Sequence, residues 1–342
     1  MAYTAIDDAG IFFNTKLYTG TGASNAQTGV GFQPDFTWIK NRDAADFHVL
    51  TDAVRGVTDY LVSDDTDAET TNAESLTGFD SDGFTVGTMN EVNTNTEAFV
   101  AWNWKANGAG SSNTDGTINT TATSANTTTG VSISTYTGTG SNATIGHGLG
   151  VTPSMVIVKK TSSTGDWTVY HRSLGATKYI FLQLPDAAGT QTSIWNDTEP
   201  TTTVFTVGTS SVVNYDGPTY EAYCFAQKQG YSKLGGYTGN LDADGPFVYT
   251  GFRPAFVLFK GNNTSDWQLW DNKRDTFNPV EKALHPDIPN TASTDQDIDF
   301  LSNGFKIRSD QAHLNGDGVT FIYMAFAESP FVNSEGVPTN AR

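Results

Sequence analysis

The hydrophobic positions of the chain fall into three similar patterns. Each pattern has a glycine, a proline three positions later, an apolar run and a closing lysine, and the copies occupy residues 31–40, 150–159 and 251–260. Because proline lacks a backbone N–H and fixes its own φ, it suits the entrance of a strand rather than the middle of a ladder. Each copy therefore predicts a turn that leads into a buried strand.

The same landmarks surround each copy in the same order. A Tyr-Thr-Gly sequence precedes it, and an Asp-aromatic pair, an aromatic strand and a longer apolar strand follow at nearly constant spacing. These landmarks lie at 18–20, 136–138 and 237–239; at 46–47, 166–167 and 266–267; at 84–86, 205–207 and 305–307; and at 98–102, 222–225 and 322–326. Because these landmarks have the same order and nearly the same spacing in all three places, they indicate an internal repeat.

Each repeat of about 100 residues contains roughly five to eight short strand candidates and no helical period, which is typical of an antiparallel sandwich. We therefore predict an all-β chain of three tandem antiparallel β-sandwich repeats, jelly-roll-like in type. The run at 280–284 follows Pro279 and is compatible with a short helix.

The predicted domains are repeat 1 at 1–106, a linker at 107–129, repeat 2 at 130–229, and repeat 3 with a C-terminal tail at 230–342. Glycine, serine, threonine, asparagine and alanine dominate the linker, and Ile118 is its only larger apolar side chain. Such a segment cannot bury a core, and as a coil it spans roughly 27 Å. We expect repeats 2 and 3 to form a rigid pair, with repeat 1 placed more independently.

Charge excludes one class of partner. The 342 residues include 19 Lys plus Arg against 37 Asp plus Glu, for a net charge of −18, so we expect no nucleic-acid binding. No apolar run is long enough to span a membrane, and residues 1–8 lack an export signal, so we expect no membrane insertion. The single cysteine, Cys224, cannot form an intrachain disulfide and is expected in the core.

Several strings resemble a domain that recurs in structural-gene regions of marine tailed bacteriophages. They lie at 237–258, 298–306 and 323–331 in repeat 3, at 165–175 in repeat 2, and at 1–8 and 55–60 in repeat 1. Proteins of this kind are usually called virion structural, tail-fibre-like or of unknown function. The resemblance supplies no catalytic residue.

These observations favour a non-enzymatic virion structural protein, part of a tail fibre or adhesin-like appendage that contacts the host surface or neighbouring virion subunits. A capsid-decorating protein (head spike or cement) and a glycan-binding or glycan-cleaving module are the alternatives. The expected partners are other virion proteins, a host surface glycan and further copies of the chain, with a trimer suggested by family analogy. No cofactor is expected.

The acidic runs offer little evidence for a metal site. Residues 80–83 suggest a calcium loop, but the matching stretch 301–304 replaces one acid with leucine and the other with asparagine, so a hairpin turn is the better interpretation. The acids within 295–299 alternate along a predicted strand and suit a solvated face. We therefore expect no metal.

Three residues remain as candidate contacts with glycan or protein. The positions that correspond approximately to Trp104 in the other two repeats are polar, Gln227 and Glu328. This comparison suggests that the ring of Trp104 is exposed. Trp195 lies in a polar loop, and exposed tryptophans mark glycan or protein contacts. His171 neighbours Arg172 but has no partner serine in a nucleophile elbow, so it is a candidate binding residue and not a catalytic one.

Overall fold

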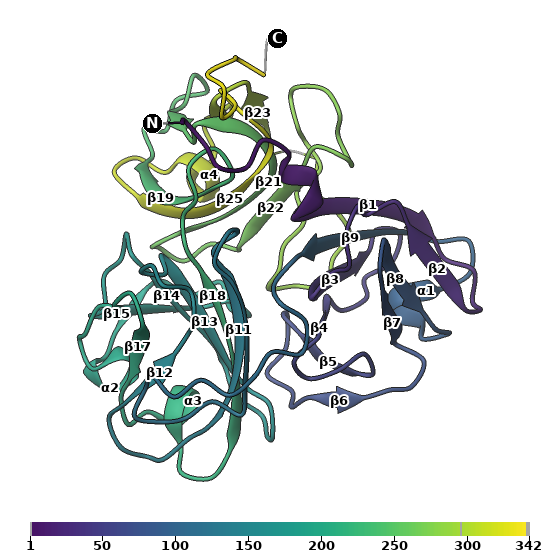
Figure 1. The fold of residues 1–342 in the computed structure, drawn as a ribbon. Helices are drawn as coiled ribbons and strands as arrows, with labels where there is room; N and C mark the ends of the chain where they lie inside the picture. The colour runs from purple at the N-terminus through teal and green to yellow at the C-terminus, as the bar shows by residue number, and fades with distance from the viewer. Residues whose placement is uncertain (1, 295, 340–342) are drawn as a thin grey trace.

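The computed structural model describes residues 2–294 and 296–339, and the fold is all-β (Figure 1). The strands form six antiparallel sheets, three large and three small. Large and small sheets pack in pairs over apolar cores, so the predicted sandwich-like architecture is confirmed. No helix in the described ranges is long and apolar enough to cross a membrane.

We call the three sheet pairs unit 1 (up to residue 106), unit 2 (107–229) and unit 3 (from residue 230). Unit 1 has a large sheet of β1 (Phe13–Thr19), β9 (Ala98–Trp104), β3 (Phe36–Asn41), β4 (Val49–Asp52), β5 (Asp59–Val62) and β6 (Thr70–Thr71), and a small sheet of β2 (Asn25–Thr28), β8 (Gly83–Val86) and β7 (Leu76–Asp80). Unit 2 has a large sheet of β10 (Ala122–Asn126), β11 (Val131–Thr137), β18 (Thr219–Phe225), β13 (Met155–Lys160), β14 (Trp167–His171), β15 (Lys178–Phe181) and β16 (Gly189–Thr190), and a small sheet of β12 (Ala143–Gly146) and β17 (Val204–Val207). Unit 3 has a large sheet of β19 (Ser232–Thr238), β25 (Thr320–Pro330), β21 (Phe252–Gly261) and β22 (Gln268–Asp271), and a small sheet of β20 (Phe247–Tyr249), β24 (Gly304–Ile307) and β23 (Ile298–Leu301).

Strand order corresponds among the large sheets. The strand that carries the Tyr-Thr-Gly landmark (β1, β11 or β19) pairs with the last strand of its unit (β9, β18 or β25), which pairs with the strand after the Gly-x-x-Pro turn (β3, β13 or β21). The register also corresponds, because Phe36 faces Trp104, Met155 faces Phe225 and Phe256 faces Phe326. This register identifies equivalent positions by geometry.

The Gly-x-x-Pro turns lead into buried strands, as predicted. Gly31, Gly150 and Gly251 all have positive φ, which glycine adopts without strain. In units 1 and 2 the proline precedes the strand, whereas Pro254 lies inside β21 at a break in the register with β25. A β-bulge there accommodates the missing backbone donor.

Each unit contains a single helical turn after its aromatic strand: α1 (Asn90–Asn93), α3 (Ser211–Asn214) and α4 (Ala312–Asn315). The asparagine that ends each turn is buried, and its side-chain oxygen accepts a hydrogen bond at 2.8–2.9 Å from the backbone N–H of the residue that follows the Tyr-Thr-Gly landmark. That tyrosine donates its hydroxyl to the preceding carbonyl of the turn. Buried polar groups at the open end of each sandwich are therefore satisfied.

Two further short helices, η1 (Ala9–Ile11) and α2 (Thr192–Trp195), complete the inventory of the described residues. The helix expected at 280–284 is wrong. Val280, Ala283 and Leu284 instead form isolated antiparallel bridges, because these residues fit against neighbouring extended chain and bury their side chains there.

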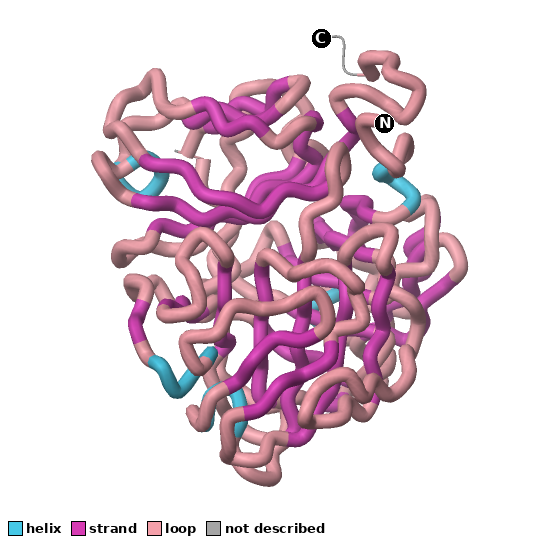
Figure 2. Tube along the Cα trace, turned by 60° about the vertical axis from the view of Figure 1, so that its left-hand side comes forward, coloured by secondary structure: helices cyan, strands magenta, loops and turns pink. Residues whose placement is uncertain are grey.

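The three large sheets face one another around a common aromatic core (Figures 1 and 2). Alternate residues of β3 and β13 point into this core, and the others point into the sandwich of their own unit, whereas consecutive residues of β21 all belong to the shared core, which includes the sandwich of unit 3. Burial on both faces explains why these strands are continuously apolar rather than alternating. The three units form a ring of lobes in Figure 1.

The prediction that residues 107–129 form an unstructured linker is wrong in part. Residues 122–126 form β10, which pairs with β11 along five residues, and Ser111 and Ile118 form bridges with Thr123 and Ile145. Backbone hydrogen bonding needs no large side chain, so a threonine-rich segment can extend a sheet at its edge. The expected independence of unit 1 is also wrong, because its aromatic residues lie in the core shared by all three units.

Candidate functional site

The structure buries Trp104 completely, so its predicted exposure is wrong. Its geometric counterparts are Phe225 and Phe326, two positions before the polar residues that the sequence suggested. The three rings meet at the centre of the molecule, with centroid separations of 6.5 Å from Trp104 to Phe225, 5.7 Å from Trp104 to Phe326, and 6.2 Å between the phenylalanines. Trp104 is a core residue that joins the units.

Trp195 is buried as well, so it does not offer the exposed ring that the sequence suggested. It ends α2 and packs edge-on against Tyr170, with 6.1 Å between the ring centroids. The polar residues around it cover an apolar side chain that belongs to the core of unit 2. Neither tryptophan can stack on a ligand in this conformation.

His171 is also buried, and it lies at the contact between units 2 and 3. Its Nε2–H donates to the carbonyl of Tyr323 at 3.2 Å, and its Nδ1 accepts from the backbone N–H of Ser173 at 3.1 Å. Burial lowers the pKa of the imidazole to about 4, so the ring is neutral at pH 7. Both nitrogens are occupied by backbone groups, so the side chain orients a contact between units.

In the other two units the residue at the position equivalent to His171 also binds a neighbouring unit. Asp52 and Asp271 occupy the corresponding register positions on β4 and β22. Asp52 accepts a hydrogen bond from the hydroxyl of Tyr223 in unit 2 at 2.8 Å, and Asp271 accepts from Nε1 of Trp102 in unit 1 at 3.1 Å. Each unit thus contacts the next one, and unit 3 contacts unit 1.

We call the three contacts between units the seams. In two of the three seams an arginine forms an ion pair with the aspartate. Arg55 and Arg274 form ion pairs with Asp52 and Asp271 at 2.6 and 2.5 Å, and the side chains of both pairs are almost fully buried. The guanidinium of Arg274 also lies over the ring of Trp102, at 5.8 Å from the centroid. In the seam between units 2 and 3 a neutral histidine replaces this charged pair.

Indole and ammonium groups bind carbonyl oxygens across two seams. Nε1 of Trp167 donates to the carbonyl of Val62 in unit 1 at 2.8 Å, and Nε1 of Trp267 donates to that of Phe181 in unit 2 at 2.9 Å. The ammonium of Lys159 likewise binds a carbonyl in unit 1, and burial lowers its pKa to about 8 against the effect of nearby carboxylates. The closing lysines of the repeated pattern are therefore structural.

The described residues of the acidic runs are held by hydrogen bonds and ion pairs within the protein. Residues 80–83 make the β7–β8 hairpin, as predicted, and the carboxylate of Asp82 accepts hydrogen bonds from the N–H groups of Gly29 and Gly31 at 2.9 and 2.8 Å. These bonds lower the pKa of Asp82. Asp299 pairs with Arg308 at 2.6 Å, whereas Asp295 lies outside the described residues. Within the described ranges, no three histidine, cysteine or acidic side chains gather around a possible metal position.

Unit 3 contains a polar pocket of about 600 Å³ that neither sequence pattern nor repeat alignment indicated. The pocket lies beside the chain between β22 and β23, where the described residues form isolated bridges and no strand, whereas units 1 and 2 carry two additional strands there. Its buried floor includes Gln268, Gln296 and His285, and exposed Thr264 and Thr291 lie at its rim.

Two amides on the floor of this pocket have unsatisfied oxygens. Oε1 of Gln268 and Oε1 of Gln296 are inaccessible and have no hydrogen-bond partner among the described residues. Gln268 is 1% exposed and Gln296 is 6% exposed. A buried amide oxygen without a partner is unfavourable, and such atoms in a native structure require an explanation.

A carboxyl group close to this pocket carries a shifted pKa. Burial, reinforced by the charge of Asp266, raises the pKa of Asp287 to about 7, and hydrogen bonds from the backbone N–H of Trp267 oppose the shift. In unit 2 the neutral side chain of Gln183 accepts the corresponding bond from Trp167. The carboxyl of Asp287 therefore fills a structural position that an amide can also fill.

Comparison with known proteins adds one match. A family model described as "Domain of unknown function (DUF7483)" matches residues 8–330, a range that contains all six sheets. No curated protein matches the sequence. One model spanning the three units agrees with a core to which all three contribute. The chain belongs to the DUF7483 family of domains of unknown function.

Proposed function

We propose that this chain is a non-enzymatic structural protein of a tailed-bacteriophage virion, located in a tail fibre or adhesin-like appendage. The observation that carries the proposal is the ring of three sheet pairs around one buried aromatic core. Such a ring is a rigid body with approximate threefold character, which suits attachment to a partner of threefold symmetry. The partners are other virion proteins, and the location is the virion.

The use of polar side chains supports a structural role. The groups at equivalent positions of the three units, His171, Asp52 and Asp271, all bind neighbouring units and are buried. The strings at 237–258 and 298–306, which resemble a phage structural domain, support the virion assignment. Threefold character within one chain also offers an alternative to the homotrimer suggested by family analogy.

The experiment is mass spectrometry of purified virions, followed by labelling with an antibody against the chain and electron microscopy. Label on the tail is the expected result. Label on the capsid would favour the capsid-decorating alternative, and absence of the chain from purified particles would refute both. Release of reducing sugar from host glycans by the purified chain would refute the non-enzymatic assignment.

A further inference from the structure

Unit 3 leaves one edge of its small sheet open. β20 is the edge strand of this sheet, which lies on the far side of the large sheet from the other two units (Figures 1 and 2). We propose that two copies of the chain associate by pairing their β20 strands antiparallel, so that the two small sheets become one continuous sheet. The inference concerns the isolated chain in solution and stands independently of the virion proposal.

Alternate backbone groups of β20 point away from its own sheet. The N–H of Ile307 donates to the carbonyl of Pro246 at 3.1 Å, so in this antiparallel pair the next residue that bonds to β24 is Val248. The N–H and C=O groups of Phe247 and Tyr249 therefore point to the open edge, and no other described residue forms a hydrogen bond with them. Unpaired groups of this kind are a template for another strand.

The equivalent edge of unit 2 already carries an added segment. Ile145 and Val248 are equivalent, because each faces the phenylalanine of the aromatic strand. Ile118 forms a parallel bridge with Ile145 on the open side of β12, and its N–H donates to the carbonyl of Thr144 at 3.1 Å. This sandwich therefore accepts a further extended chain at this edge.

In unit 1 a side chain protects the equivalent edge. The ammonium of Lys16 donates to the carbonyl of Thr28 at 2.7 Å. Thr28 is equivalent to Tyr249, because each faces the first glycine of the neighbouring strand. Lysine is a common protection of edge strands. Unit 3 has Gly235 where unit 1 has Lys16, two residues before the tyrosine of the Tyr-Thr-Gly landmark, and so lacks this protection.

The side chains at the edge also distinguish unit 3. Phe247 and Tyr249 are 45% and 52% exposed. The equivalent positions of the other two units hold small side chains: Ala26, Thr28, Thr144 and Gly146. Exposed aromatic rings on one face of an open edge strand stabilise strand pairing, because they form cross-strand pairs.

The geometry of β20 fits a second copy of itself. The outward groups lie symmetrically about Val248, so a twofold axis at this residue places Phe247 of each copy opposite Tyr249 of the other. Each such pair exchanges both of its backbone hydrogen bonds, and its two rings meet on the same face of the sheet.

Charge favours this edge over a more acidic face. The strands of the small sheet contain one acid and one cation, Asp299 and Lys306, whereas the whole chain has a net charge of −18. Next to these strands Lys306 pairs with Asp244, and Arg308 pairs with Asp299. Long-range repulsion between two acidic chains remains, and salt screens it. Association should therefore strengthen as the ionic strength rises.

Sedimentation equilibrium of the full chain from about 5 to about 500 µM tests the pairing. The contact is small, so we expect a weak dimer with a dissociation constant of roughly 10–100 µM that tightens between about 0.05 and about 0.5 M salt. Phe247→Lys places a charge at the edge and should raise this constant at least about tenfold. Phe277→Lys makes the same change at a site of unit 3 that is 79% exposed and should leave it unchanged.

An exchange of charges tests the register. Phe247→Lys and Tyr249→Glu should each weaken self-association, but a mixture of the two variants should form a heterodimer, because opposite charges then face each other on one side of the axis and the aromatic pair remains on the other. The replaced side chains are exposed, so the melting temperatures should match that of the parent chain. A chain that stays monomeric throughout, a dimer that survives Phe247→Lys or is lost in Phe277→Lys, or a mixture that does not associate would each overturn the proposal.

Discussion

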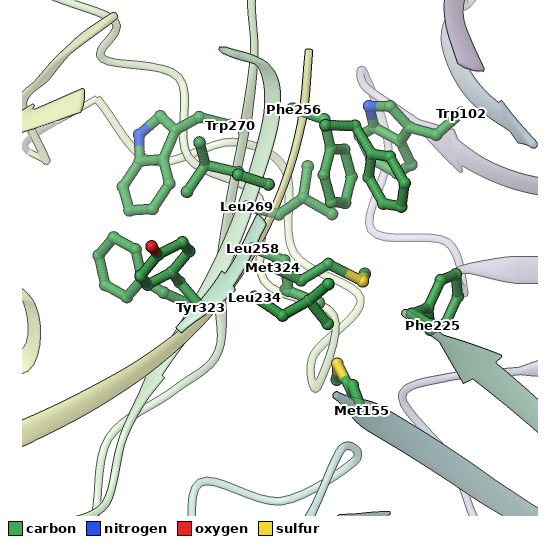
Figure 3. Close-up of a cluster of buried hydrophobic side chains, with 14 of the residues drawn as sticks. Trp102, Met155, Phe225, Leu234, Phe256, Leu258, Leu269, Trp270, Tyr323 and Met324 are labelled. Carbon is green, nitrogen blue, oxygen red and sulfur yellow. The ribbon is translucent and has the colours of Figure 1, made fainter. Parts of the chain in front are cut away.

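The central contact of the three units can be tested at Trp104. The ring of Trp104 lies within aromatic contact distance of five other rings, with centroid separations of 5.0–6.5 Å: Phe13, Phe36, Phe225, Phe256 and Phe326. Trp104→Ala removes a fully buried indole, and large-to-small changes of this kind lower the free energy of unfolding by about 3–5 kcal/mol. Figure 3 shows how Trp102, Phe225 and Phe256 gather in the same core.

The conservative change Trp104→Phe should behave differently. Units 2 and 3 carry phenylalanine at this register position, and Nε1 of Trp104 has no hydrogen-bond partner among the described residues. Removing an unpartnered buried donor recovers about 1–3 kcal/mol, which offsets the lost packing volume. We therefore expect the free energy of unfolding to stay within about 1 kcal/mol of the parent value.

Urea unfolding followed by far-UV circular dichroism measures both values, and hydrogen exchange locates the effect. Trp104→Ala should speed amide exchange in all three units, whereas Trp195→Ala, which empties the separate core of unit 2, should speed it mainly there. Equal losses for the phenylalanine and alanine variants would refute the interpretation of the unpartnered indole. Faster exchange confined to unit 1 in Trp104→Ala would refute the shared core.

Three further predictions concern pH, a seam and the segment after unit 1. Folded Asp287 keeps its proton up to about pH 7, whereas an unfolded aspartate loses it at about pH 3.9, so the free energy of unfolding should fall as the pH rises from about 4 to about 7. Asp287→Asn should reduce this dependence of the unfolding free energy on pH, measured by urea unfolding at several pH values. An unchanged dependence in the variant would show that Asp287 is not its source. Tyr223→Phe removes the hydroxyl that donates to Asp52 and should lower the free energy of unfolding by about 1–3 kcal/mol, unlike the control Tyr215→Phe at an exposed site. Limited proteolysis should leave residues 107–129 uncut while the termini are trimmed, and early cleavage there would contradict the pairing of β10.

The sequence predicts local structure correctly where a few residues close together in the chain determine it. The glycine and proline of each repeated turn specify a strand entrance, and all three turn glycines have the positive φ that such a turn uses. The hairpin at 80–83 followed from the turn residues that its counterpart in unit 3 retains. These features depend on neighbours in the chain.

Other features depend on register and on contacts between units. Counting from landmarks misplaced the counterparts of Trp104 by two positions, which is enough to replace phenylalanines with polar residues in the comparison. A continuous apolar run indicates burial on both faces, but it does not identify what covers the second face. The orphaned amides of Gln268 and Gln296 are distant in sequence, and only the folded chain shows that they share a pocket.

The closed ring has a consequence for how the molecule can vary. Three separate subunits would come apart on dilution and would carry every substitution three times, whereas covalently joined units remain together at any concentration because their association is intramolecular. One unit can then change while the other two preserve the framework. Unit 3 has the smallest of the large sheets and the polar pocket. A covalently linked ring can thus carry a specialised surface on one unit alone, which an assembly of identical chains cannot do.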